Sequence, residues 1–86
     1  MLDIGKKFAI ILPKGKIFVQ INNILELGKI VKNARKSQGL TQADLAISAD
    51  VGVRFIVDLE NGKETAQIGK VLRVCQMLGL EIELKG

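Results

Sequence analysis

The chain of 86 residues has no histidine, tryptophan or tyrosine, and it has a single cysteine and a single proline. The absence of histidine removes the commonest general base and the commonest metal ligand of proteins. No carboxylate pair, glycine-rich phosphate loop or nucleophile beside a base stands out in the remaining sequence. We therefore expect a protein that is not an enzyme and that has no metal, cofactor or small-molecule substrate.

Disulfide bonds and membrane spans are not expected either. Cys75 falls at a core position of a helical pattern, which favours a buried, inert thiol. Lys6 and Lys7 precede a run of five apolar residues that looks like the start of a signal peptide, but the run ends at Pro13 and is too short for export or membrane insertion. These features predict a cytoplasmic protein without a membrane partner.

Positive charge is concentrated in the first part of the chain. Residues 1–36 hold eight Lys or Arg against two acids, whereas residues 37–86 hold five against seven, and the net charge is +4. Such a balance fits a phosphate backbone or an acidic partner, although it is also common in proteins that bind neither. A single domain of this size is marginal as a lone monomer, which favours a dimer.

Three segments differ in their pattern. Residues 1–22 contain two β-rich runs around Pro13 and Gly15, which predict a hairpin of residues 7–12 and 16–21. This segment is either an arm that meets a partner or a strand pair that covers the core. Residues 23–79 have helical periodicity, and residues 80–86 begin with a strict alternation of apolar and acidic side chains that is typical of a strand.

The helical segment opens with two well-marked helices. Asn22 or Asn23 can cap the first, and Gly39 supplies a left-handed stop. Thr41 can cap the second, with Asp44 at the return position of a capping box. The second helix is therefore expected to begin sharply.

Two further helices follow a tight turn at residues 49–52. The third helix is expected at 53–60, ended by Asn61 and Gly62. Thr65 is expected to cap a fourth helix, whose apolar stripe consists of Ile68, Val71, Leu72, Cys75 and Leu78. Two short helices around a tight turn, here the second and third, form the outline of a helix-turn-helix, which places one helix in the major groove of DNA.

Four residues share the outward face of the third helix: Val53, Arg54, Val57 and Asp58. Phe55 and Leu59 lie opposite and anchor the helix, with Ile56 near the edge. Arginine can donate two hydrogen bonds to guanine, and valine can contact the thymine methyl group. Aspartate can either hold the arginine or accept a hydrogen bond from cytosine. This face is predicted to read bases.

A simpler interpretation of the same face needs no DNA. Arg54 and Asp58 would form only an exposed intrahelical ion pair, worth roughly 0.3–0.5 kcal/mol, and the valines would pad a protein contact. That interpretation gives no good reason for two outward valines, so we favour base reading.

The predicted phosphate contacts surround the third helix. Gln42 lies in the first turn of the second helix, where its amide and free backbone N–H groups can bind a phosphate oxygen together. Thr41, Asn61 and Lys63 can flank the same backbone. Each of them alone is explained as well by a cap or a turn, and only their joint placement indicates DNA.

The motif Leu40-Thr41-Gln42 with Leu45-Ala46, followed after the turn by Glu60-Asn61-Gly62-Lys63, resembles the phage-repressor-like, or Xre-type, helix-turn-helix domain. Within that family, several runs are similar to HipB-type antitoxins of the Hip kinase modules. These runs are Arg54-Phe55-Ile56, residues 58–63, Thr65-Ala66-Gln67, residues 69–72 and Leu78-Gly79-Leu80. The resemblance covers about residues 25–84, and residues 1–22 have no match.

The resemblance implies a mainly α, lambda-repressor-like domain of four or five helices with a short C-terminal strand. It implies an ion pair between Arg35 and Glu60 that positions the first helix, as well as the phosphate and base contacts named above. It further implies a two-fold dimer and a serine/threonine-kinase toxin that is held inactive in the complex, with the pair repressing their own operon. Two residues depart from the family pattern, since Asp50 stands where glycine is usual and Gly52 where Ser or Thr usually caps the helix.

The C-terminal strand provides a route to the dimer. Leu80, Ile82 and Leu84 form one apolar side of it, and an exposed edge of this kind is expected to pair with its copy. The predicted function is an operator-binding repressor and antitoxin that acts as a dimer on double-stranded DNA. Two alternatives remain open: a stand-alone regulator without a toxin, and a helix-turn-helix that serves only protein interactions.

Overall fold

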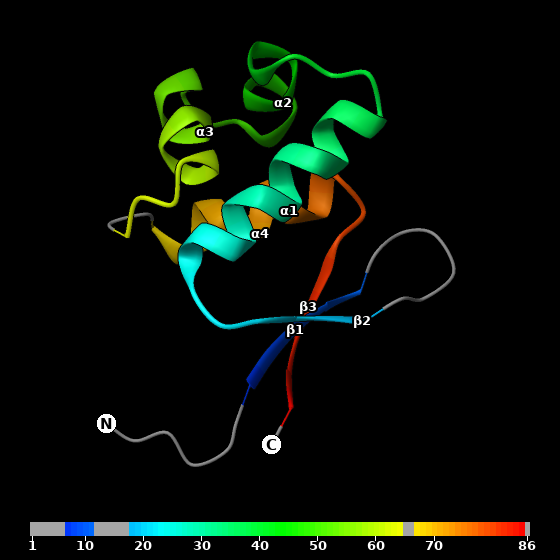
Figure 1. The fold of residues 1–86 in the computed structure, drawn as a ribbon. Helices are drawn as coiled ribbons and strands as arrows, with labels where there is room; N and C mark the ends of the chain where they lie inside the picture. The colour runs from blue at the N-terminus through cyan, green and yellow to red at the C-terminus, as the bar shows by residue number, and fades with distance from the viewer. Residues whose placement is uncertain (1–6, 12–17, 65–66, 86) are drawn as a thin grey trace.

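The computed structural model describes residues 7–11, 18–64 and 67–85, and within these ranges the chain forms four helices and three strands. The strands are β1 (Lys7–Ile11), β2 (Phe18–Ile21) and β3 (Glu81–Lys85). The helices are α1 (Ile24–Ser37), α2 (Gln42–Ala49), α3 (Val53–Glu60) and α4 (Ile68–Met77). The helices pack together at one end of the molecule, and the strands lie at the other end (Figure 1). The mainly α fold with a short sheet agrees with the prediction.

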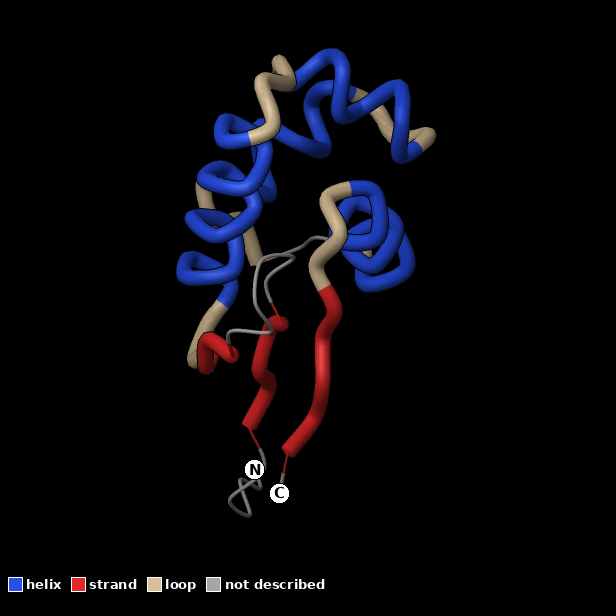
Figure 2. Tube along the Cα trace, turned by 90° about the vertical axis from the view of Figure 1, so that its right-hand side faces the viewer, coloured by secondary structure: helices blue, strands red, loops and turns tan. Residues whose placement is uncertain are grey.

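The sheet joins the two ends of the chain. Its order is β2-β1-β3, and both pairings are antiparallel. Ile10 is opposite Val19 on one side and Ile82 on the other, so the middle strand belongs to the N-terminal hairpin. Figure 2 shows β1 and β3 running side by side away from the helices. The predicted hairpin is therefore present, and the predicted turn at Pro13 lies outside the described residues.

Strand β3 already has a partner within its own chain. Its register with β1 runs from Lys7 opposite Lys85 to Ile11 opposite Glu81. Since β1 occupies one edge of β3, only the opposite edge remains for another strand among the described residues. The sequence interpretation did not foresee this pairing, because nothing in either segment specifies a partner that lies so far away along the chain.

The core is formed mainly between the helices, and the sheet adds Ile10 of β1 to it. Its largest fully buried side chains are Ile10, Val31, Leu45, Ile56, Leu59, Val71, Val74, Cys75 and Leu78. Burial raises the pKa of the Cys75 thiol to about 11, because the thiolate would have to leave water. The prediction of a buried, inert thiol agrees with this environment.

Helix α4 differs from its prediction in two ways. It begins at Ile68 with Gln67 as the N-cap, so the predicted start after Thr65, a residue outside the described ranges, is wrong. Gln67 makes no capping hydrogen bond with its side chain. Ile68 and Leu72 are also exposed, at 69% and 45%, because the buried face is rotated toward Val74. The sequence pattern could not distinguish these faces, since apolar residues occupy both.

Candidate nucleic-acid interface

Helices α2 and α3 and the turn between them form the predicted helix-turn-helix. Asp50 has a left-handed backbone with φ 57°, and the N–H of Val51 donates to the carbonyl oxygen of Ala46 at 3.0 Å. Aspartate tolerates this conformation better than most residues. Gly52 is the N-cap of α3 and has extended backbone angles without a capping side chain. The backbone of the turn therefore accommodates both departures from the family pattern.

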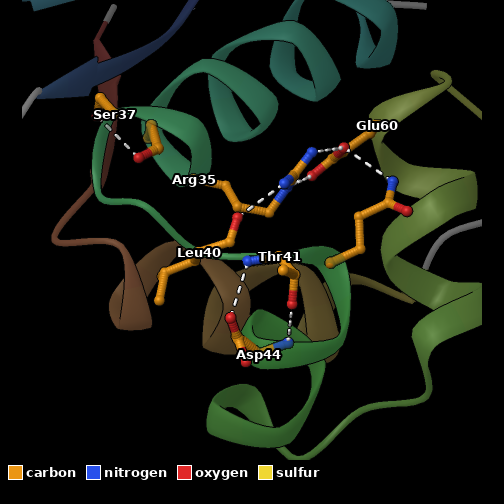
Figure 3. Close-up of polar contacts among 8 residues, drawn as sticks. Arg35, Ser37, Leu40, Thr41, Asp44 and Glu60 are labelled. Atoms are coloured by element: carbon orange, nitrogen blue, oxygen red, sulfur yellow. Dashed lines mark hydrogen bonds and ion pairs between the residues drawn. The ribbon is translucent and has the colours of Figure 1, made fainter.

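A capping box fixes the start of α2, as the sequence predicts. The backbone N–H of Asp44 donates to the Thr41 hydroxyl at 3.0 Å, and the backbone N–H of Thr41 donates to the Asp44 carboxylate at 2.9 Å (Figure 3). Hydrogen bonding to the carboxylate from Thr41, by its backbone N–H first and by its hydroxyl second, holds the pKa of Asp44 below its usual value. The hydrogen bonds stabilise the charged carboxylate at the N-terminus of the helix, where negative charge is favoured.

Arg35 and Glu60 form a buried ion pair between α1 and α3. The Nε and Nη2 atoms of Arg35 donate to the two carboxylate oxygens of Glu60 at 2.7 and 3.0 Å, and Nη1 donates to the Leu40 carbonyl oxygen at 2.9 Å (Figure 3). The two side chains are only 8% and 2% exposed. The hydrogen bond to Glu60 raises the pKa of Arg35, and this effect outweighs the opposing effect of burial. The pair ties the C-terminal end of α3 to α1.

Gln42 is linked to this buried pair. Its Nε2 atom donates to Oε1 of Glu60 at 3.1 Å, and its side chain is half-buried. The sequence analysis predicts a phosphate contact for Gln42, which stays a prediction, and it does not reveal this bond, because a contact between the start of α2 and the end of α3 is not local. The bond orients the first turn of α2 relative to α3, so the two proposed contact elements are held as one unit.

The outward face of α3 has the predicted members with unequal exposure. Arg54 has 82% of its side chain exposed, Val53 is 46% exposed, and Val57 and Asp58 are half-buried. Ile56 was expected near the edge of the opposite face, but it is fully buried, whereas Phe55 is only half-buried under the ammonium group of Lys70. The anchoring face is therefore centred on Ile56, Leu59 and Glu60.

Asp58 contacts two cations. Its Oδ1 lies 3.3 Å from Nε of Arg54, and its Oδ2 lies 3.6 Å from Nζ of Lys63. The backbone N–H of Lys63 also donates to the Asp58 carbonyl oxygen at 3.0 Å. The intrahelical pair of the simpler interpretation is therefore present, but it belongs to a three-residue cluster that includes a predicted phosphate contact.

The loop after α3 is held close to α1. Gly62 has φ 79°, and a Cβ there would lie 2.8 Å from a methyl carbon of Leu25. Gly28 is still more tightly placed, because a Cβ on it would lie 2.3 Å from the carbonyl oxygen of Leu59. Asn61 is exposed beside this contact. Sequence reasoning did not single out Gly28, although a glycine inside a helix is a signal of close approach.

The residues predicted for dimerisation are divided between the core and the sheet. Leu80 is 3% exposed and belongs to the core, Ile82 is half-buried against it, and the Leu84 side chain lies outside the described residues. An apolar groove of about 510 Å³ lies nearby, and Ile68, Leu72 and Ile82 are among the residues that line it. The dimerisation role stays a prediction.

The described residues contain no cluster of three or more His, Cys, Asp or Glu side chains that could hold a metal ion. Within the same ranges, every helix is too short or too polar to cross a membrane.

Comparisons with known proteins agree with this geometry. The helix-turn-helix family model HTH_3 matches residues 31–85, so the chain belongs to this family. Over 65 residues, 76% of this chain and 86% of the other, it is 54% identical to the "Uncharacterized HTH-type transcriptional regulator y4mF" of Sinorhizobium fredii. These matches support the coarser part of the prediction, a DNA-binding regulator of the helix-turn-helix type.

Two other similarities are more distant. Human endothelial differentiation-related factor 1 is 33% identical over 61 residues, which are 71% of this chain and 41% of that protein. The chain therefore aligns with less than half of that longer protein. A solved structure described as "MDT Protein" superposes with a TM-score of 0.74 at 25% identity, covering 80% of this chain and 97% of the other. The arrangement of helices is thus shared with a known structure.

Proposed function

We propose that the protein is a dimeric, operator-binding repressor and the antitoxin of a type II module with a Hip-type serine/threonine-kinase toxin. The observation that carries the DNA-binding part is the exposed face of α3, where Arg54 and Val53 point away from a helix anchored by Ile56 and Glu60. With 82% of its side chain exposed, Arg54 has guanidinium donors available for a partner outside the chain. The proposed role requires no catalytic residue.

The proposed contacts with DNA follow from the placement of these side chains. Helix α3 would lie in the major groove, with Arg54 donating to guanine O6 and N7 and with Val53 and Val57 against thymine methyl groups. Gln42 would contact a phosphate at the N-terminus of α2, where backbone N–H groups are free to bind an anion. Asn61 and Lys63 would contact the same strand from the loop after α3. The bond from Gln42 to Glu60 keeps these two groups in register.

A two-fold dimer is proposed because two identical copies of α3 can bind the two symmetric halves of a near-palindromic operator. Two copies of α3 would occupy successive major grooves, about 34 Å apart. Strand β3 supports this proposal, since the sheet order of the described residues leaves it an edge strand on one side. Exposed edges tend to be paired or covered in native proteins.

The toxin partner rests on the resemblance to HipB-type antitoxins, which extends from α3 into α4. If the protein has such a partner, a kinase gene should lie beside its own gene, and the two gene products should form a complex. A stand-alone regulator shares every DNA contact and lacks only this partner. Co-expression of the protein with the product of the neighbouring gene, followed by affinity purification and a kinase assay, separates the two cases.

Binding to its own upstream DNA tests the repressor role. The purified protein should bind this duplex more tightly than a scrambled duplex, and Arg54→Ala should lose the preference while it keeps weak, salt-sensitive binding. Arg73→Ala is the matched control, because Arg73 is exposed on α4 and donates to the Asp50 carbonyl oxygen rather than to a carboxylate on α3. Equal and negligible binding of both duplexes by the wild type would instead support a protein-interaction module.

A further inference from the structure

Among the described residues, Asp58 is the one carboxylate in contact with two of the cations that the proposed function assigns to DNA. Its two oxygens lie 3.3 Å from Arg54 Nε and 3.6 Å from Lys63 Nζ. Arg54 and Lys63 are well exposed, at 82% and 55%, whereas Asp58 is only 25% exposed. The carboxylate is therefore the less mobile member of the cluster, and the two cations extend from it toward solvent.

The cluster belongs to the free protein, and phosphates compete for its two cations. Arg54 can donate from Nε to Asp58 while its two terminal nitrogens donate to guanine, but a contact of the guanidinium with a phosphate draws it away from the carboxylate. Lys63 has the same conflict, because an ammonium group that contacts a phosphate moves away from its carboxylate. Each move leaves Asp58 near the phosphate backbone with less compensation of its negative charge.

We propose that Asp58 is a specificity-determining residue, which weakens binding to non-cognate DNA more than binding to the operator. On any DNA, phosphates attract Arg54 and Lys63 away from the carboxylate, and the carboxylate is then repelled by the backbone. On the operator, guanine fixes Arg54 close to Asp58, and a cytosine amino group can donate to the free oxygen. Only the operator therefore restores partners to the carboxylate, and discrimination arises from a penalty on the wrong sequence.

This inference rests on the proposed function, since it concerns the same DNA site. It differs from a general charge effect, in which any acid near the interface would weaken binding to all DNA equally. Glu64 provides the comparison, because it follows Lys63, is exposed and carries the same charge, whereas the ion pairs of Arg54 and Lys63 within the described residues are made with Asp58.

The test measures the affinity of the wild type, Asp58→Asn and Glu64→Gln for the upstream and scrambled duplexes by fluorescence anisotropy at two salt concentrations. We expect Asp58→Asn to bind the scrambled duplex about fivefold to tenfold more tightly at about 0.1 M salt, because the two cations no longer leave a carboxylate behind that the phosphates repel. Its preference for the upstream duplex should fall accordingly. Glu64→Gln should leave that preference unchanged.

A second comparison asks whether the effect depends on the two cations. In an Arg54→Gln, Lys63→Gln background, Asp58→Asn should strengthen binding to the scrambled duplex less than it does in the wild-type background, because the repulsion by phosphates remains but no cation is left to compete for. Thermal unfolding of each variant checks that the fold is retained.

Three results would overturn the inference while the proposed function stands. The first is that Asp58→Asn and Glu64→Gln change the affinity for the scrambled duplex equally. The second is that Asp58→Asn binds both duplexes more weakly than the wild type. The third is that Asp58→Asn loses affinity for the upstream duplex while its affinity for the scrambled duplex is unchanged. The last result would make Asp58 a simple base acceptor. If the wild type binds neither duplex, the proposed function itself fails, and the inference fails with it.

Discussion

Two arginine–carboxylate pairs involve α3, and their surroundings give them opposite roles. Arg35 and Glu60 are separated by 25 residues in the chain and meet in the interior at 2.7 and 3.0 Å. Arg54 and Asp58 are one helical turn apart and meet at the surface at 3.3 Å. The buried pair cannot change partners without leaving a charge in the interior, whereas the exposed pair can exchange its partners for water, salt or DNA. The buried arginine–carboxylate pair therefore fixes the position of α3, whereas the exposed pair leaves its side chains able to contact other molecules.

The largest expected effect comes from breaking the buried pair. Arg35→Met should lower the free energy of unfolding by about 3–5 kcal/mol, because it leaves the Glu60 carboxylate buried without its cation. Urea unfolding followed by circular dichroism measures this. The double variant Arg35→Met, Glu60→Leu should lose much less, since no charge remains buried; an equal or greater loss in the double variant would contradict this account.

The second effect tests the close approach that lets the buried pair form. Gly28→Ala should destabilise the protein by about 1–3 kcal/mol, because the new methyl group would lie 2.3 Å from the Leu59 carbonyl oxygen and 3.0 Å from that of Glu60. Gly69→Ala is the matched control, since a methyl group on that glycine, in the first turn of α4, would meet no atom within 4 Å. Its stability should stay the same or rise by up to about 1 kcal/mol. Similar losses in both variants would indicate that close packing is not the cause.

Breaking the exposed pair should act on binding and hardly on folding. Arg54→Ala should lose about 1–3 kcal/mol of discrimination between the upstream and scrambled duplexes. Its free energy of unfolding should change by less than about 0.5 kcal/mol, because exposed pairs contribute little. Anisotropy titrations and urea unfolding on the same preparation measure the two quantities. A large loss of stability with unchanged discrimination would reverse the roles assigned to the two pairs.

The smallest effects concern the capping box beside the buried pair. Thr41→Ala should lower stability by about 1 kcal/mol, the usual value for a lost N-cap. Because the pKa of Asp44 is lowered in the folded protein, its contribution is present above the pKa of the unfolded chain, near about 4, and is lost as the pH falls through the folded value. Unfolding curves between about pH 2 and 6 should show this loss in the wild type, and the loss should be reduced in Asp44→Asn. If Asp44→Asn shows the same pH dependence as the wild type, the loss of stability at low pH comes from other carboxylates.

The parts of the fold that the sequence predicted are those with local signals. The ends of α1, α2 and α3 were correctly placed because Asn23, Thr41 and the glycines at positions 39 and 62 act within one turn of their own helix. The start of α4 was misplaced because its N-cap, Gln67, makes no capping hydrogen bond that a pattern could reveal. The start of a helix can thus be predicted from sequence only where a side chain makes the capping hydrogen bond.

The sequence could indicate which residues share the outward face of α3, but it could not indicate how exposed each one is or which distant side chains it contacts. A helical wheel placed Val53, Arg54, Val57 and Asp58 on one face, and the structure gives them unequal exposure because the anchoring face is centred on Ile56. The buried pair was expected only from the resemblance to a family, since spacing in the chain does not indicate which carboxylate a distant arginine meets. The bond from Gln42 to Glu60 was not anticipated for the same reason. The ion pair of Lys63 with Asp58 is local, and it was not anticipated because it depends on the turn that follows α3.

By itself, the sequence determined the presence of the four helices, the caps of α1 and α2, the tight turn and the set of residues that α3 directs away from its buried face, because these depend on interactions between neighbours in the chain. Only the tertiary structure decided that β1 would pair with β3, that Ile68 and Leu72 would stay exposed, and that Arg35 would meet Glu60 in the interior. Those outcomes depend on which surfaces of the folded chain pack against each other and are thereby removed from water. The physical reason is that burial is a property of the whole chain, whereas capping and periodicity are properties of a few residues.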